Sequence, residues 1–378
     1  MTWLAERFEL ARQGGGKHVL SMEGLRGFAV FLVFLVHYAS LIEPWLAAGG
    51  GTAGSAAAIH TIGNAGVDLF FVLSGFLIYG SLIRRETPFL PYMGQRIRRI
   101  YPAFTVVFVV YAALSFAMPS QSKIPTGALA GATWLLQNFL LLPGLFPIEP
   151  MITVAWSLSY EMFYYLVLPP VILAFALRRR PPQWRVAFFA AVGVAIVLMC
   201  ALIGGPVRMV MFIAGILMVE AMASPRVQAP SSGVALVVLV AGLAATLVKF
   251  PGAVGAVAHS LILAATFFAL CFCCFKRPDD TLARAFTWKP MRWLGNMSYS
   301  YYLLHGLALK AGFMILSKLA PTTTNEPVLF IAMLLPMFVL TLIPTALLFL
   351  FVERPFSLAR QKPVAITTPV PSGAEKVH

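Results

Sequence analysis

Two polar side chains interrupt the apolar stretch Leu25–Tyr38, and their spacing suits shared chemistry. Arg26 lies at the start of the stretch and His37 lies near its end. A helix has about 3.6 residues per turn, so both side chains leave it on nearly the same face, roughly 16 Å apart along the axis. His37 is a candidate general base that takes a proton from a hydroxyl. The alternative is a packing histidine with a satisfied hydrogen bond.

A pair of arginines precedes the apolar run that begins at residue 101. Arg96 and Arg99 are three residues apart, so they share a face if this segment is helical. Two planar guanidinium groups on one face can bind a phosphate group. Arginines before a membrane helix are also an ordinary topology signal. We predict that Arg96, Arg99 and Arg26 bind the phosphates of a cofactor.

Two carboxylates lie in apolar segments, where an ionisable group is costly and needs a reason. Asp68 is expected either to cap its helix or to orient a catalytic group. Ser74, in the same segment, is a candidate for substrate contact, although an interhelical hydrogen bond is the simpler interpretation. Glu161 is expected in the outer half of the membrane, where it polarises an imidazole or holds a sugar hydroxyl.

Aromatic and polar residues around the second carboxylate and near the C-terminus complete the candidate site. Trp156 and Tyr160 flank Glu161 and are predicted to bind substrate, or to form an aromatic belt at the membrane surface. His305 follows a tyrosine-rich run and is predicted either to contact substrate or to pack. Glu353 and Arg354 are interpreted as an ion pair that locks a helix end.

Composition indicates an integral membrane protein. Of the 378 residues, 60% are hydrophobic and only 11% are charged, against about 25% charged in soluble domains. The mean hydropathy is +0.84. The net charge of +14 is therefore attributed to topology and to contact with anionic lipids, not to nucleic acid. The four cysteines lie in apolar segments and lack the spacing of a metal site, so no metal is expected.

The apolar runs predict an all-α membrane fold, a bundle of about ten transmembrane helices. The expected spans are 25–46, 66–83, 101–118, 153–177, 186–203, 207–223, 233–249, 255–275, 295–318 and 328–352.

The arrangement of the basic residues predicts the topology. Most of the 28 Lys and Arg residues fall on one side of these spans, which places both termini in the cytoplasm. The stretch 127–142 is expected to be a re-entrant or periplasm-lying helix that packs against the bundle without crossing, and 49–63 is expected to be flexible. The domains are an interfacial segment over 1–20, a membrane domain over 21–356 and a disordered tail over 357–378.

Six motifs occur in order along the chain, and together they resemble the membrane-bound acyltransferase family 3, the type that acetylates O-antigens and exopolysaccharides. They are LRG followed by His37, GVDLFFVLSGFLI, the arginine pair before IYP, WSLSYE, SYSYYLLH and VERP.

The resemblance implies roles for several of these residues. Arg26 and His37 match the family's essential Arg and His, and Arg96 and Arg99 match its paired arginines. Glu161 matches the acid of the WSL motif. Two departures are Gln95, where the family often has arginine, and the MFYY sequence that follows the acid.

The resemblance further implies acyl transfer from cytoplasmic acyl-CoA, usually acetyl-CoA, which is a co-substrate with no permanently bound cofactor. The implied acceptor is a hydroxyl of a lipid-linked or cell-surface glycan, at the bacterial inner membrane. Two alternatives stay open: a proton-coupled transporter that uses His37, Asp68, Glu161 and His305 as a relay, and an acylase of a macrolide-like small molecule. The sequence carries no prediction of an oligomeric state.

Overall fold

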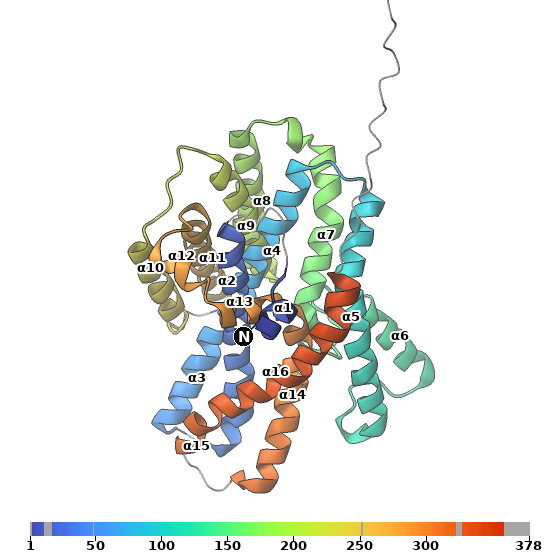
Figure 1. The fold of residues 1–378 in the computed structure, drawn as a ribbon. Coiled ribbons are helices and arrows are strands. Elements are labelled where there is room, and N and C mark those ends of the chain that lie inside the picture. The colour runs from blue at the N-terminus through green and yellow to red at the C-terminus, as the bar shows by residue number, and fades with distance from the viewer. Residues whose placement is uncertain (1, 11–16, 48, 251, 323–326, 359–378) are drawn as a thin grey trace, which may run out of the picture.

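The computed structural model describes residues 2–10, 17–47, 49–250, 252–322 and 327–358, and every regular element in them is helical (Figure 1). The helices are α1 Thr2–Phe8, α2 Lys17–Ile42, α3 Gly51–Gly63, α4 Ala65–Arg84, α5 Phe89–Ala117, α6 Ala128–Phe139, α7 Trp156–Ala174, α8 Pro182–Ile203, α9 Val210–Ala223, α10 Ser232–Ala245, α11 Gly252–Lys276, α12 Thr281–Ala285, α13 Lys289–Asn296, α14 Ser298–Leu319, α15 Pro327–Ala332, α16 Leu334–Leu348 and the π-helix η7 Phe349–Ser357.

Eight helical segments are long and apolar enough to cross a membrane. They are 19–45, 51–84, 89–117, 153–174, 182–203, 252–276, 298–319 and 327–357. The other two expected spans, 207–223 and 233–249, correspond to α9 and α10, which have 14 residues each. A helix of that length covers about 21 Å, less than the hydrocarbon core of a bilayer. The protein is thus a multi-pass membrane protein with eight full-length candidate spans among its described residues.

Two expectations about helical segments are corrected by the structure. The third span begins at Phe89 and not at residue 101, so Arg96 and Arg99 lie inside α5 and do not precede it. The stretch 49–63, expected to be flexible, is mostly the helix α3. Its alanines favour a helix, and Gly63 lets α3 approach α2 so closely that a Cβ there would lie 2.7 Å from the carbonyl oxygen of Leu32.

The short helix expected within 127–142 is confirmed as α6, which lies beside α5 at the edge of the bundle (Figure 1). It has 12 residues, too few to span a bilayer. The ring of Phe139 at its end packs against Tyr101, Phe104 and Phe108 of α5. These contacts pack the end of α6 against the middle of α5.

Glycines permit the closest helix contacts of the core. A Cβ at Gly75 in α4 would lie 2.2 Å from the carbonyl oxygen of Phe212, and one at Gly215 in α9 would lie 2.0 Å from that of Val72. The two helices therefore pack backbone to backbone, as small residues allow in membranes. This contact holds α4, which carries Ser74, in a fixed position beside α9.

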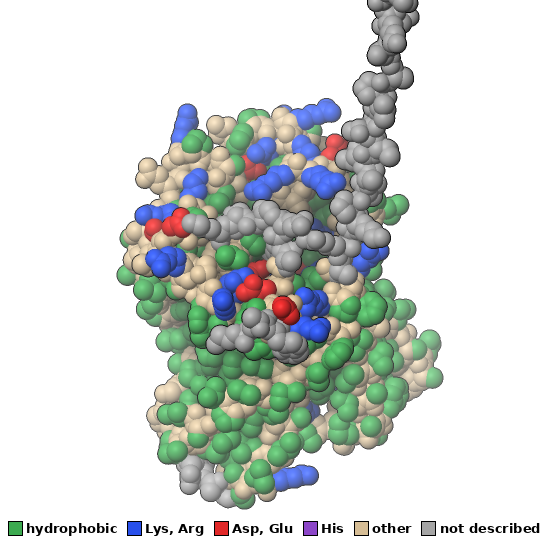
Figure 2. Space-filling model, viewed as in Figure 1, with side chains coloured by type: hydrophobic (Ala, Val, Ile, Leu, Met, Phe, Trp, Pro, Cys, Tyr) green, Lys and Arg blue, Asp and Glu red, His purple; other side chains and the backbone are tan. Residues whose placement is uncertain are grey.

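The surface is divided by polarity on the face that Figure 2 shows. Lys, Arg, Asp and Glu side chains gather over the upper half and the centre, and hydrophobic side chains cover the lower half (Figure 2). The N-terminal helix α1 lies near the centre and packs on the protein: the Phe8 ring stacks on Phe349 at 5.7 Å. The expected interfacial segment is thus helical over Thr2–Phe8, while most of the expected tail, 359–378, lies outside the described residues.

Candidate active site

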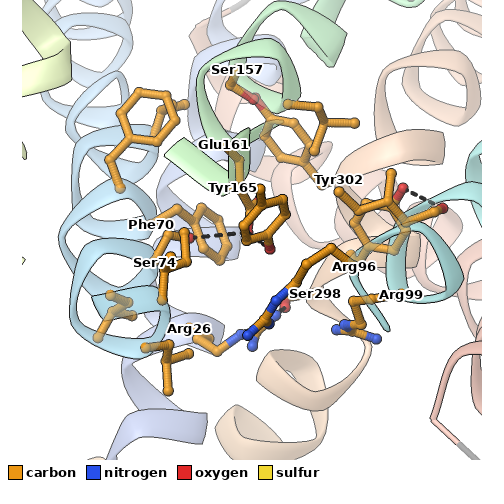
Figure 3. A pocket seen from close by; sticks show the side chains of 18 residues that line it. Arg26, Phe70, Ser74, Arg96, Arg99, Ser157, Glu161, Tyr165, Ser298 and Tyr302 are labelled. Atoms are coloured by element: carbon orange, nitrogen blue, oxygen red, sulfur yellow. Dashed lines mark hydrogen bonds between the residues drawn. The ribbon is translucent and has the colours of Figure 1, made fainter. Parts of the chain in front are cut away.

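Three arginines converge on one cavity inside the bundle. Arg26 comes from α2, and Arg96 and Arg99 come from α5. The cavity has a volume of about 170 Å³, and its wall also includes Ser74 and Glu161. Figure 3 shows the three arginine side chains pointing into this space, which we call the arginine cavity. The structure therefore brings together all three residues that the sequence assigned to phosphate binding.

Arg26 is held by the first residue of α14. Its Nε and Nη2 donate to the Ser298 hydroxyl oxygen over 3.2 and 2.9 Å. Both groups line the arginine cavity, so the guanidinium is fixed at the wall and not folded back along α2. A serine that accepts both bonds limits the rotamers of Arg26 and orients its fork toward the cavity.

Arg96 lies between two aromatic rings. The guanidinium carbon is 4.9 Å from the ring centroid of Tyr92 and 5.1 Å from that of Tyr165, which are cation–π distances. Its Nη2 donates to the Ser81 hydroxyl over 3.3 Å. The buried Nε has no hydrogen-bond partner among the described residues, so Arg96 keeps a donor available at the cavity.

Arg99 is fixed by Glu353, a residue of the VERP motif. Arg99 Nη1 lies 2.7 Å from Glu353 Oε1. The other oxygen, Oε2, accepts from the backbone N–H of Ser300 at 3.1 Å and from its hydroxyl at 2.6 Å. The interpretation of Glu353 and Arg354 as a local ion pair is wrong, because Arg354 instead donates to the carbonyl oxygen of Glu6. Glu353 thus orients a cavity arginine and ties η7 to α5 and α14.

Glu161 lies on the wall of the arginine cavity, together with the three arginines. Its Oε1 accepts from the Tyr165 hydroxyl over 2.5 Å and from the Ser74 hydroxyl over 3.5 Å. Ser74 therefore makes an interhelical hydrogen bond between α4 and α7. Of the two roles expected for Glu161, polarising an imidazole is not met here, since no histidine among the described residues lines the arginine cavity and His37 lines a different one.

The second cavity, of about 660 Å³, contains His37 and three lysines. Lys310 and Lys318 come from α14, and Lys123 comes from the segment before α6. We call it the lysine cavity. The structure places Arg26 and His37 on one helix, as the spacing predicts, but at the walls of two separate cavities.

A row of three neighbouring rings runs from one cavity to the other. The Tyr302 hydroxyl, on the arginine cavity, is 2.7 Å from the Ser157 hydroxyl. The His305 ring lies 6.1 Å from the Tyr302 ring and 4.9 Å from the His37 ring, centroid to centroid. A path from the arginines to His37 therefore passes Tyr302 and His305.

His305 is completely buried and forms the middle of this row. Its Nδ1 is 2.8 Å from the carbonyl oxygen of Tyr301. Because a carbonyl only accepts, we assign the ring hydrogen to Nδ1, which leaves the Nε2 lone pair without a partner among the described residues. In this conformation His305 is buried and contacts His37. A substrate could reach His305 only if the row of rings opened.

Asp68, Trp156 and Tyr160 line neither of these two cavities. Asp68 is buried in the first turn of α4 and lies 3.5 Å from Arg208 Nε. It is not the cap of its helix, which is Asn64. Trp156 packs 5.4 Å from the Tyr160 ring and 5.8 Å from the Arg208 guanidinium. The structure separates these three residues from His37 and the cavity arginines.

Five polar residues that line the arginine cavity were absent from the sequence prediction: Ser157, Tyr165, Ser298, Tyr299 and Tyr302. Ser298 and Tyr302 belong to the SYSYYLLH motif, and together with His305 they recur at helical spacing, which places them on one face of α14. That periodicity could have identified Ser298 and Tyr302 as site residues. Nothing in the sequence indicates which helix packs against this face of α14.

Comparisons with known proteins give a family match and several relatives. The acyltransferase domain family, acyltransferase 3, matches residues 19–348. The chain is 27% identical to acyltransferase MdmB of Streptomyces mycarofaciens, over 94% of this chain and 96% of that protein. It is 28% identical to the exopolysaccharide production protein ExoZ of Rhizobium meliloti, over 36% and 41% of the two chains. It is also 28% identical to O-acetyltransferase OatA of Staphylococcus aureus, over 44% and 26%. No solved structure matches the chain.

Proposed function

Because the chain belongs to the acyltransferase 3 family and is a membrane O-acyltransferase, we propose that it moves an acetyl group from cytoplasmic acyl-CoA to a glycan hydroxyl. The observation that carries this proposal is the pairing of two cavities. One contains three arginines and the other contains His37, with a single row of rings between them. Such an arrangement suits a donor and an acceptor that enter from opposite faces of a membrane.

The arginine cavity is the proposed donor site. Coenzyme A carries several phosphate oxygens, and guanidinium groups bind such oxygens in pairs. Arg26 lies nearer the N-terminal end of α2, and basic residues on that side of the spans favour a cytoplasmic location. The phosphates would lie against Arg26, Arg96 and Arg99, and the pantetheine arm would extend toward Tyr302.

His37 is the proposed general base. The acceptor hydroxyl gives its proton to an imidazole nitrogen of His37 while its oxygen forms a bond to the thioester carbonyl carbon. The carbon–sulfur bond then breaks, and the thiolate of coenzyme A takes the acceptor's proton from the imidazolium. An acyl-His37 intermediate is the alternative route, with the same overall balance. In both routes the Tyr302–His305 row must open for the thioester to reach His37.

A glycan acceptor is supported by the name of one relative, an exopolysaccharide production protein, and by the O-acetyltransferase activity that another name states. The relative that matches nearly the whole chain is named only as an acyltransferase. We place the enzyme in the bacterial inner membrane, because its donor is cytoplasmic and its acceptor is exported.

The proposal is tested by mass spectrometry of cell-surface glycans in a strain that lacks the gene. Plasmid-borne wild-type protein should restore an acetyl ester, seen as a gain of about 42 Da because an acetyl group replaces a hydrogen, and His37→Ala should not, at equal membrane abundance. Glycans that are identical with and without the gene would overturn the glycan acceptor. In that case cell extracts are searched for an acetylated small molecule. Proton-coupled solute uptake by the reconstituted protein, without consumption of acyl-CoA, would support the transporter instead.

A further inference from the structure

Lys310 is a charged residue near the middle of a membrane-spanning helix. It lies nine positions before Leu319, the last residue of α14, which corresponds to roughly 14 Å of helix. Its side chain is exposed at the lysine cavity and makes no hydrogen bond or ion pair with any described residue. An ammonium group at such a depth is costly unless it faces water or a ligand, so its position calls for a binding role.

Two further lysines line the cavity, and Lys318 adds to its positive charge whereas the charge of Lys123 is offset by an ion pair. Lys318 is exposed near the end of α14, and it also makes no polar contact with a described residue. Lys123 lies 3.0 Å from Glu149 and donates to the carbonyl oxygen of Pro150. The residues that line the cavity include no aspartate or glutamate. A cavity with cations and no acid on its wall attracts anions.

The rest of the wall suits a ligand with an apolar part. Leu114, Leu307 and Met314 line it. A lysine at the end of a helix can extend to the membrane surface, which explains Lys318 without a ligand. Lys310 has no such explanation, because it lies about two and a half turns from the helix end and borders the cavity that contains His37.

We propose that the lysine cavity binds an acceptor that carries an anionic oxygen group, a phosphate or a carboxylate, beside the hydroxyl that is acylated. Lys310 binds the anion, and Lys318 contributes charge at the mouth of the cavity. The inference rests on the proposed function, because it identifies the second cavity as the acceptor site. It narrows the acceptor from glycans in general to a phosphate-linked lipid carrier or to a glycan that contains uronic acid.

Equilibrium binding tests this without acyl transfer. The full-length protein is placed in nanodiscs of phosphatidylcholine, which has no net charge. Two anionic probes, farnesyl phosphate and 4-nitrophenyl β-D-glucuronide, are compared with their neutral counterparts, farnesol and 4-nitrophenyl β-D-glucoside. The variants are Lys310→Gln and, as a matched control, Lys249→Gln, an exposed lysine that does not line the cavity.

At least one anionic probe should bind about tenfold more tightly than its neutral counterpart, and Lys310→Gln should remove that difference while Lys249→Gln keeps it. The probe that shows the difference identifies phosphate or carboxylate as the anion. Equal binding of charged and neutral probes, or an unchanged Lys310→Gln variant, would overturn the inference. Equally strong displacement by phosphatidylglycerol would also overturn it, since the cavity would then be a lipid headgroup site.

The two proposals fail separately. If the anionic probes bind through Lys310 but glycans lack the acetyl ester, the acyl-transfer assignment fails and the anion site stands. If glycans are acetylated and the probes show no preference, the anion site fails and the acyl-transfer assignment stands.

Discussion

Arg99 Nη1 lies 2.7 Å from Glu353 Oε1, although 254 residues separate the two in the chain. Glu353 is completely buried, and its second oxygen is occupied by Ser300. The pair therefore connects the C-terminal π-helix to the arginine cavity. A motif that the sequence suggested as a helix lock is instead the support of a proposed phosphate-binding residue.

The first prediction concerns this support. Glu353→Gln removes the charge that orients Arg99, and we expect the KM for acetyl-CoA to rise about tenfold with kcat changed much less. Loss of a charge-assisted hydrogen bond costs about 1.5 kcal/mol, which corresponds to that factor. The measurement is acetyl-CoA-dependent acetylation by purified protein. The exposed Glu43→Gln is the control, and an unchanged KM in Glu353→Gln would refute the role.

The second prediction concerns Arg26. Ser298→Ala removes the hydroxyl that accepts hydrogen bonds of 3.2 and 2.9 Å from the Arg26 guanidinium, so we expect about fivefold weaker binding of coenzyme A. Arg26→Lys should weaken binding more, because a lysine lacks the planar fork. Calorimetric titration with coenzyme A measures both. Arg26→Lys binding as tightly as the wild type would show that only charge matters there.

The third prediction concerns the row of rings between the cavities. Tyr302→Ala removes the ring that separates them and should increase hydrolysis of acetyl-CoA in the absence of acceptor, because water then reaches the thioester. Tyr302→Phe loses only the 2.7 Å hydrogen bond to Ser157 and should stay near the wild-type rate. Thiol release is the readout. Equal hydrolysis by all three proteins would mean that Tyr302 is no barrier.

The fourth prediction concerns stability away from both cavities. Glu220 is buried, and it accepts two hydrogen bonds from Arg185, of 2.7 and 2.6 Å, and one from the Tyr79 hydroxyl. Glu220→Gln leaves Arg185 without its counterion, so we expect a loss of about 3 kcal/mol, seen as a lower thermal midpoint in detergent. Glu86→Gln removes an exposed ion pair of 3.9 Å and should shift the midpoint little. A thermal midpoint of Glu220→Gln equal to that of the wild type would contradict this prediction.

The sequence predicted the local features of the site well. The helix that carries Arg26 and His37, and the shared face of Arg96 and Arg99, follow from helical periodicity, which neighbouring residues determine. It also predicted an intramembrane acid at Glu161. These features need no knowledge of which helices pack together.

The features of the site that depend on packing between distant helices could not be predicted from the sequence. Glu161 was expected to polarise an imidazole or to hold a sugar hydroxyl, but the approach of α4, α5 and α7 places it on a wall whose described residues include three arginines and no histidine. The pairing of Glu353 with Arg99 depends on the position of η7 against α5, which no local pattern specifies. The row of rings that runs between the two cavities depends on packing between α2 and α14, and ring packing across helices has no signature in sequence spacing.

The most direct test reconstitutes the protein in vesicles, with radiolabelled acetyl-CoA outside and acceptor glycan trapped inside. The account predicts labelled glycan in the lumen for the fraction of molecules whose arginine cavity faces outward. It predicts none for His37→Ala, with coenzyme A binding unchanged. Label that appears only when donor and acceptor share one side, or His37→Ala transfer at the wild-type rate, would contradict the two-cavity account.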